Sequence, residues 1–380
     1  MTRISSAFDA YINANILLVV AFSLWLVTRF VLNRTGMRHA YGTQLALLNA
    51  VFLAIVFSPF IAFAYRQMTS AGLLPNSLHL NLSDIMLAQY LNGAIAMSPT
   101  DMERLLSLRE TLGAGLLQPA GWLQHTIVAL MIAGFLACLG RCGIASLRLR
   151  RIIADSYPWR RFGRVQLRLS DQALVPFSAR GLRRRYIVMP ANMLLRPQDM
   201  RIALAHEFQH LRQRDVEWEI GLELFKSLFF WNPVVHYWKR QIEQLRELSC
   251  DQKVLSRRHF DVQDYCDCLL RVCEDTLRRQ PAQAIALPRV SLVQFDRRFF
   301  RPAGLTLLRR RVDSLFAAAT VSDRRKVSFL ITAVLVATLT LATIAIQRPT
   351  GWSHDRLMLS SIINLERLES LNGRASFSSW

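Results

Sequence analysis

The chain has 380 residues, of which 52% are hydrophobic, and its mean hydropathy is positive. A soluble domain of this length would be less apolar, so the composition argues against one. With 47 basic and 27 acidic residues the formal net charge is +20, which fits either a nucleic-acid-binding protein or a membrane protein with positive cytoplasmic loops.

Four apolar runs stand out, at roughly residues 12–32, 45–65, 122–141 and 327–346. Each is long enough to form a helix of about 30 Å, which spans the hydrocarbon core of a bilayer. The first run is followed by "VTRFVLNRTG", which offers no small-residue cleavage site, so we interpret it as an anchor and not as a signal peptide. The predicted fold class is therefore a mainly α membrane protein with four transmembrane helices.

The charge of the connecting segments predicts their orientation. Residues 33–44 hold two arginines and no acid, residues 66–121 hold three basic and four acidic residues, and residues 145–326 hold 35 basic and 19 acidic residues, a net charge of +16. Basic residues near span ends mark the cytoplasmic side. We therefore expect a multi-pass protein of the bacterial inner membrane, with both termini outside and residues 145–326 in the cytoplasm. Anionic lipid accounts for the excess charge, and without a nucleic-acid motif we expect no direct nucleic-acid binding.

These expectations divide the chain into six parts. They are transmembrane helices 1 and 2 with a short cytoplasmic loop (1–65), an extracytoplasmic loop (66–121), transmembrane helix 3 (122–144), a cytoplasmic domain (145–326), transmembrane helix 4 (327–346) and a short extracytoplasmic tail (347–380). In the outer loop, "SPTDMERLL" predicts a helix start at which Thr100 and Glu103 have the spacing of a capping box. All six cysteines fall in the third span or the cytoplasmic domain, where disulfides are rare, so we expect free thiols.

The cytoplasmic domain has an α+β pattern. Alternating runs at 164–170, 173–179 and 184–190, bounded by Asp, Gly and Pro, predict a small sheet. Pro197 stands at the expected start of a helix that reaches about residue 214. A second helix is expected over about 216–230. Pro233 then interrupts it, and a long helix follows over about 234–258.

The first of these helices contains "HEFQH", with His206 and His210 four residues apart. Residues at this spacing lie on the same helix face, so both imidazoles could bind one metal ion. Zinc accepts nitrogen ligands, and a catalytic zinc keeps one position for water. Glu207 could take a proton from that water, as in the H-E-x-x-H arrangement of zinc metalloproteases. The alternative is two surface histidines on an ordinary helix, and a third ligand would decide between them.

The long helix carries "RELSCD", in which Glu247 and Asp251 are also four residues apart. Glu247 is our candidate for the third zinc ligand. Asp251, one turn further on, could accept a hydrogen bond from a ligand imidazole and fix its orientation. The alternative for both acids is a pair of solvated charges. His236 could approach the site and steady a transition-state oxyanion, although a structural histidine is the simpler interpretation.

Residues 175–255 resemble the integral-membrane zinc metallopeptidases of the β-lactam-sensor and antirepressor family, the BlaR/MecR type. The shared marks are "PFSARG" before "IVMP", "HEFQHLRQRD", "FFWNPVVHYW" and "RELSCD", together with four spans of which the last two flank the zinc domain. The resemblance implies a gluzincin-like fold with His206, His210 and Glu247 as zinc ligands and Glu207 as the catalytic residue. Asp215 belongs to the family pattern without a role that the residues alone reveal. Members of the family cleave themselves, a cytoplasmic winged-helix repressor, or both.

The resemblance departs from the β-lactam sensors at one point. They carry a penicillin-binding domain after the fourth span, and the 34 residues that follow it here, 347–380, are too few for one, so lactam sensing is not expected. The predicted function is a membrane zinc endopeptidase that signals by cleaving a protein. One alternative is a membrane-protein quality-control protease of the HtpX type. Another is a non-catalytic membrane sensor, against which the intact Glu207 argues.

Overall fold

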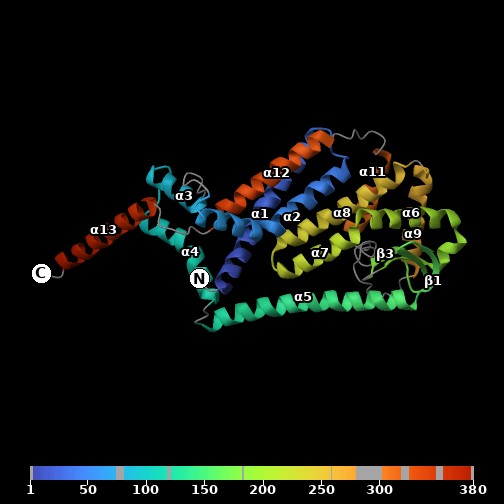
Figure 1. The fold of residues 1–380 in the computed structure, drawn as a ribbon, viewed down its shortest axis with the longest axis horizontal. Coiled ribbons are helices and arrows are strands. Elements are labelled where there is room, and N and C mark those ends of the chain that lie inside the picture. The colour runs from blue at the N-terminus through green and yellow to red at the C-terminus, as the bar shows by residue number, and fades with distance from the viewer. Residues whose placement is uncertain are drawn as a thin grey trace. The chain divides into compact units, whose positions relative to one another are not determined.

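The computed structural model describes residues 3–73, 81–117, 121–181, 184–257, 259–279, 302–317, 325–347 and 354–377. These residues are mainly helical (Figure 1). Internal contacts divide the chain into two compact units. One comprises Met1–Leu24, Ala50–Met131 and Phe329–Trp380, and the other comprises Trp25–Asn49 and Ile132–Ser328.

Four helices in the described residues are long and apolar enough to cross a membrane. They are Ala7–Arg34 within α1 (Arg3–Arg34), Tyr41–Thr69 within α2 (Tyr41–Ser70), α5 (Trp122–Asp155) and Val327–Ala345 within α12 (Arg325–Ala345). Each contains one of the predicted apolar runs. Helix α5 continues past the predicted end of its span at residue 144, because its arginine-rich extension is composed mostly of Ala, Leu and Arg, which favour helices.

The first unit also contains three further helices outside the apolar runs. They are α3 (Leu82–Leu91), α4 (Pro99–Leu117) and α13 (His354–Phe377). A small core joins them, formed by Leu87, Met102, Leu359 and Ile363. The predicted helix start in the outer loop exists, but its capping residue is Ser98, whose Oγ accepts a hydrogen bond from the Asp101 backbone N–H at 3.1 Å. The prediction of a Thr100–Glu103 capping box was therefore wrong by two residues.

The second unit contains a four-stranded sheet of order β1-β2-β4-β3. Its strands are β1 (Tyr157–Phe162), β2 (Val165–Ser170), β3 (Phe177–Arg180) and β4 (Arg185–Pro190). Strands β2 and β4 are parallel, and the two outer strands are antiparallel to their neighbours. The sheet was predicted, but β1 was not, and β3 is shorter than the run expected at 173–179. Gly163 allows the tight turn between β1 and β2, because its φ of +57° is costly for other residues.

The helices that follow the sheet in the chain carry the candidate site. They are α6 (Pro197–Gln213), α7 (Asp215–Leu228), α8 (Pro233–Leu255), α9 (Val262–Arg279) and α11 (Pro302–Ala317), with a short 3-10 helix, Ala191–Leu195, before α6. The first three match the predicted helices within a few residues, whereas α9 and α11 were not predicted. One face of α6 packs on the sheet through a core that includes Leu167, Ile187 and Ala203. Another face packs on α8, α9 and α11 through Ile202, Cys250 and Leu315.

Helices α7 and α8 are joined by buried ion pairs. The Arg246 guanidinium donates to Glu219 at 2.7 Å, and Glu219 also pairs with Lys239, which donates to Glu243 at 2.6 Å. The carboxylates around Lys239 raise the pKa of its ammonium group despite its burial. A buried charge is stable only when it is paired, so these contacts hold Arg246 in a fixed position beside α6.

Candidate metal centre

The two histidines of α6 are buried and face each other. The His206 side chain is 7% exposed and that of His210 is fully buried. Their Nε2 atoms lie 3.0 Å apart, as the four-residue spacing on one helix face predicts. Helix α6 begins with Pro197 at its first position and ends where Arg214 adopts a left-handed conformation with φ 59°. This turn starts α7 directly and leaves Asp215 beside His210.

The hydrogen bonds at the far side of each ring fix where its proton lies. His210 Nδ1 is 2.7 Å from the Asp215 carboxylate, which can only accept, so Nδ1 carries the proton. His206 Nδ1 is 2.8 Å from the Tyr265 hydroxyl, whose own proton goes to Asp251 at 2.7 Å. His206 Nδ1 must therefore donate to the Tyr265 oxygen. When the imidazoles are neutral, both Nε2 atoms are unprotonated and face each other, and a metal cation bound by both nitrogens would remove the repulsion between their lone pairs.

Helix α8 brings Glu247 to the same place. Its Oε1 lies 3.7 Å from His210 Nε2 and its Oε2 lies 3.7 Å from His206 Nε2. Ligand atoms around a tetrahedral zinc lie about 3.3 Å from one another, given bonds of about 2.0 Å. The three side chains thus present two nitrogens and a carboxylate at nearly the spacing that a zinc ion requires, and these residues fit the metal.

Cys250 is a second candidate for the third ligand. Its sulfur forms a group with His206 and His210 in which one donor atom of each lies within 4.8 Å of the others. However, the sulfur is 3.7 Å from His206 Nδ1, the nitrogen that already donates to Tyr265, and the thiol itself donates to the His206 carbonyl at 3.5 Å. Glu247 approaches both free nitrogens, so the geometry favours Glu247 over Cys250.

Glu207 is the next residue on α6 after His206 and is 1% exposed. Neither carboxylate oxygen has a hydrogen-bond partner among the described residues. Burial raises the pKa of Glu207, and the nearby His210 and His206 oppose this effect. A buried carboxylate without partners is costly unless a cation or a water molecule accompanies it, and both are expected in a catalytic zinc site.

Arg311 of α11 is a part of the site that the sequence did not reveal. Its guanidinium is buried and donates to both carboxylate oxygens of Asp251, at 2.7 and 2.8 Å, and its Nη1 lies 3.3 Å from Glu247 Oε2. Burial alone would raise the pKa of Glu247, but the neighbouring His206, His210 and Arg311 lower that pKa to about 2. Arg311 and His206 likewise hold the pKa of Asp251 below its usual range, against the effect of burial.

The other sequence candidates can now be placed. Asp251 lies 3.3 Å from His206 Nδ1 but reaches it chiefly through Tyr265, which was not predicted. Asp215, whose role was left open, accepts the hydrogen bond that orients His210. The Arg246 guanidinium lies 3.8 Å from the Asp215 carboxylate.

His236 lies away from these contacts. It is exposed and donates a hydrogen bond to the Phe230 carbonyl at 2.7 Å, which is a structural role. All six cysteines are free, as expected.

The choice between Glu247 and Cys250 predicts different metal contents for single variants. Glu247→Ala should purify with much less zinc than the unchanged protein, because a ligand oxygen is lost. Asp251→Asn should weaken binding by about 10–100-fold at most, since Asp251 acts through a hydrogen bond. Cys250→Ala should keep its zinc. Metal analysis of the three purified proteins is the measurement, and full occupancy in Glu247→Ala with loss in Cys250→Ala would assign the sulfur as the ligand.

Comparison with known proteins gives two matches. The sequence profile of the family described as BlaR1 peptidase M56 matches residues 9–289, which is most of the chain and includes the motif helix, α8 and three of the four apolar helices. The regulatory protein BlaR1 of Bacillus licheniformis is 32% identical over 76 residues. That alignment covers 20% of this chain and 13% of the relative, so the chain matches only a small part of that protein.

Proposed function

This chain belongs to the BlaR1 peptidase M56 family, and from that premise we propose that it is a membrane-embedded zinc endopeptidase that signals by cleaving itself, a cytoplasmic repressor, or both. One observation carries the proposal. The Nε2 atoms of His206 and His210 and the Glu247 carboxylate converge beside the buried carboxylate of Glu207, whose oxygens have no hydrogen-bond partner within the described residues. This is the arrangement that a gluzincin-like peptidase requires.

The proposed mechanism gives each residue a separate task. His206, His210 and Glu247 would hold the zinc ion, which when bound polarises the scissile carbonyl and activates water. Glu207 would accept the proton of that water as general base and then deliver it to the leaving amine. Asp215 orients His210 directly, and Asp251 orients His206 through Tyr265. Such partners keep ligand rings in position and raise the basicity of the ligand nitrogens.

Identification of the proteins that this chain cleaves would test the proposed function against its alternatives. Newly created protein N-termini can be compared by mass spectrometry between cells that contain the unchanged protein and cells that contain Glu207→Gln. A signalling protease should create one or a few new termini, in itself or in a winged-helix repressor. Many new termini in unrelated membrane proteins would instead indicate quality control of the HtpX type. If the two cell samples have identical termini, the chain is a non-catalytic sensor and the proposal fails.

The proposed topology places residues 145–326 in the cytoplasm and both termini outside. The support is charge, since this segment has a net charge of +16 and residues 66–121 have a net charge of −1. A reporter that is active only in the periplasm should be active when fused after Trp380 or near Asn92, and silent when fused near Ala282. The opposite pattern would place the zinc site outside the cytoplasm and exclude cytoplasmic repressors as substrates.

A further inference from the structure

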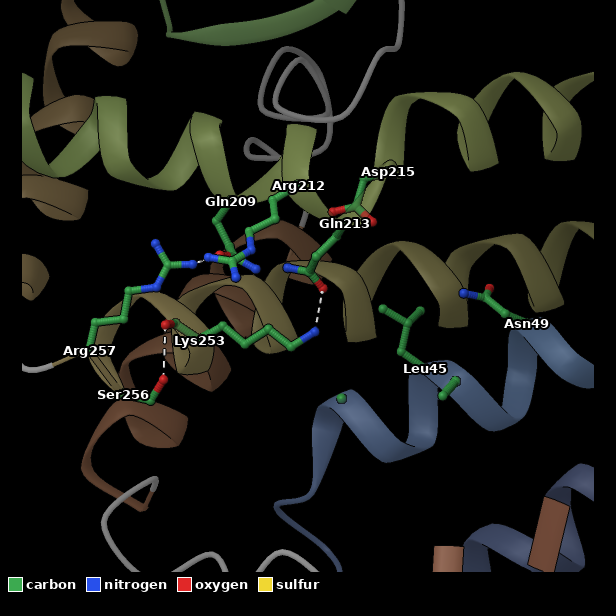
Figure 2. Close-up of a pocket in the computed structure, with 11 residues that line it drawn as sticks. Leu45, Asn49, Gln209, Arg212, Gln213, Asp215, Lys253, Ser256 and Arg257 are labelled. Atoms are coloured by element: carbon green, nitrogen blue, oxygen red, sulfur yellow. Dashed lines mark hydrogen bonds between the residues drawn. The ribbon is translucent and has the colours of Figure 1, made fainter. Parts of the chain in front are cut away.

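The second unit contains a cavity that the proposed peptidase site does not use. Its volume is about 550 Å³, and it lies between the C-terminal turns of α6 and α8 and the first three turns of α2 (Figure 2). The residues that line it are Gly42, Leu45, Ala46, Asn49, Gln209, Arg212, Gln213, Asp215, Lys253, Ser256 and Arg257. Three of these are cationic and one is an acid, so the lining has a net positive charge.

The three cations are Arg212 of α6, Lys253 of α8 and Arg257, which lies two residues beyond the end of α8. All three are solvent-exposed and extend toward the cavity (Figure 2). No carboxylate within the described residues forms an ion pair with any of them. Arg257 donates to the Gln209 side chain at 2.6 Å and Lys253 donates to the Gln213 side chain at 3.0 Å, which are neutral acceptors. Like charges that line one cavity repel each other, and an anion between them would remove that cost.

The single acid of the lining does not supply that anion. The Asp215 carboxylate accepts the hydrogen bond of His210 at 2.7 Å and has the Arg246 guanidinium at 3.8 Å. Asp215 is 3% exposed and is committed to these two partners. The positive charge of the cavity is therefore uncompensated in the described part of the chain.

The side-chain amide of Gln213 is an independent sign of a missing acceptor. Its Oε1 accepts hydrogen bonds from Lys253 and, at 3.5 Å, from Ser249, so the orientation of the amide is fixed. Its Nε2 is buried and has no acceptor within the described residues. A buried donor without an acceptor costs about 1–3 kcal/mol. An anionic oxygen in the cavity would satisfy this donor and pair with the cations at the same time.

The position of the cavity on α2 indicates where such an anion comes from. The apolar helix Tyr41–Thr69 has 29 residues and is therefore about 43 Å long, which exceeds the hydrocarbon thickness of about 30 Å. Its first two turns can thus lie at the level of the lipid headgroups, and these turns supply Leu45 and Ala46 to the lining. Apolar side chains beside cations fit the junction between the headgroup and the acyl chains of a phospholipid.

One further lining residue suggests the kind of headgroup. The Asn49 Oδ1 is a buried acceptor without a donor within the described residues. A hydroxyl group on the ligand could donate to it. We propose that this cavity binds the phosphate group of an anionic phospholipid, with a hydroxyl-bearing headgroup such as that of phosphatidylglycerol as the best fit. The inference rests on the membrane embedding that the proposed function includes, but neither the metal ion nor peptidase activity enters it.

The test uses the full-length chain carrying Glu207→Gln, which prevents self-cleavage, in micelles of a zwitterionic detergent. Short-chain phosphatidylglycerol, short-chain phosphatidylcholine and inorganic phosphate are titrated separately, and the midpoint of thermal unfolding is followed. A ligand that binds only the folded state raises this midpoint. Phosphatidylglycerol should raise it at far lower concentration than phosphatidylcholine. If inorganic phosphate alone gives the same increase at the same concentration, the site stands and its ligand is a free phosphate.

A pair of double variants assigns the effect to the cavity. Arg212→Gln with Lys253→Gln removes one lining cation from α6 and one from α8. Arg201→Gln with Arg240→Gln removes one exposed cation from each of the same helices outside the lining. The first pair should need roughly 30-fold more phosphatidylglycerol for half of the increase, because each basic residue contributes about a factor of five to the binding of anionic lipid. The control pair should behave like the parent protein.

A third variant keeps the proposal testable if the first pair does not fold. Ala46→Phe places a bulky apolar side chain in the cavity without any change of charge, and it should weaken the binding of phosphatidylglycerol as well. The proposal is overturned if the cavity and control pairs lose affinity equally, if Ala46→Phe binds like the parent protein, or if no anion raises the midpoint more than phosphatidylcholine does.

Discussion

Glu207→Gln should reduce proteolysis by about 10²–10⁴-fold while the purified protein keeps its zinc. The amide has nearly the shape of the carboxylate, but it cannot take a proton from water at neutral pH. Glu207 is not among the three side chains whose donor atoms converge, so its replacement leaves the metal ligands in place. Cleavage and metal content should be measured on the same preparation.

The control for this variant is Glu274→Gln on α9, which makes the same chemical change at an exposed ion pair with Arg278. It should cleave like the unchanged protein. Near-normal cleavage by Glu207→Gln would show that another group serves as the base. Loss of zinc together with loss of cleavage would instead make Glu207 a metal ligand.

Arg311→Met should lower the free energy of unfolding by about 3–5 kcal/mol, the range observed when one partner of a buried ion pair is removed. Arg311 and Asp251 are 3% and 0% exposed in their side chains, so water cannot replace the lost guanidinium. The variant leaves Asp251 without its main counter-charge and also removes the cation beside Glu247. Denaturant unfolding of the purified full-length protein measures the change.

Two further variants separate this effect from a general loss of charge. Arg309→Met, two residues earlier on α11 and exposed, should change stability by less than about 0.5 kcal/mol. Arg311→Met combined with Asp251→Asn should recover part of the loss, because no unpaired carboxylate remains at position 251. If the double variant is as unstable as the sum of the two single variants, the ion pair is not the source of the stability.

The stability of the unchanged protein and that of Arg311→Met should also respond differently to acid. The pKa of Asp251 lies below its unfolded value of about 3.9, so its contribution to stability is complete above that pH and is lost as the pH falls through the lowered pKa. Without Arg311 the pKa of Asp251 rises and this contribution shrinks. Arg311→Met should therefore lose less stability on acidification than the unchanged protein.

The sequence predicted those parts of the fold that depend on local patterns. The four apolar helices follow from hydropathy alone, and α6 and α8 follow from Pro197 and Pro233 together with periodic apolar residues. Strand β1 was not predicted, because all six of its residues are exposed and show no alternation of apolar and polar side chains. Helix spacing also brought His206, His210 and Glu247 forward as candidates, and the structure places them together.

The rest of the site could not be predicted because it depends on tertiary contacts. Tyr265 and Arg311 lie on helices that carry no recognisable motif, and only the folding of α9 and α11 against α8 brings them to Asp251. Asp215 follows an arginine in left-handed conformation, which the sequence did not signal, since that position usually holds glycine. His236 has a plausible helical phase relative to Glu247, but the carbonyl of Phe230 holds it instead.

Glu207 and Arg311 lie far apart in the sequence, so the ribosome makes them at different times. Ribosomes add about 5–20 residues per second, so the 104 residues from Phe208 to Arg311 take roughly 5–20 s to appear. During that interval a nascent chain already contains the complete H-E-x-x-H motif but lacks the guanidinium that compensates Asp251 and Glu247. The arrangement seen here cannot exist until translation has passed Arg311, shortly before the last apolar helix at Val327–Ala345. The ion pair between Arg311 and Asp251 therefore forms roughly 5–20 s after the motif helix has been made.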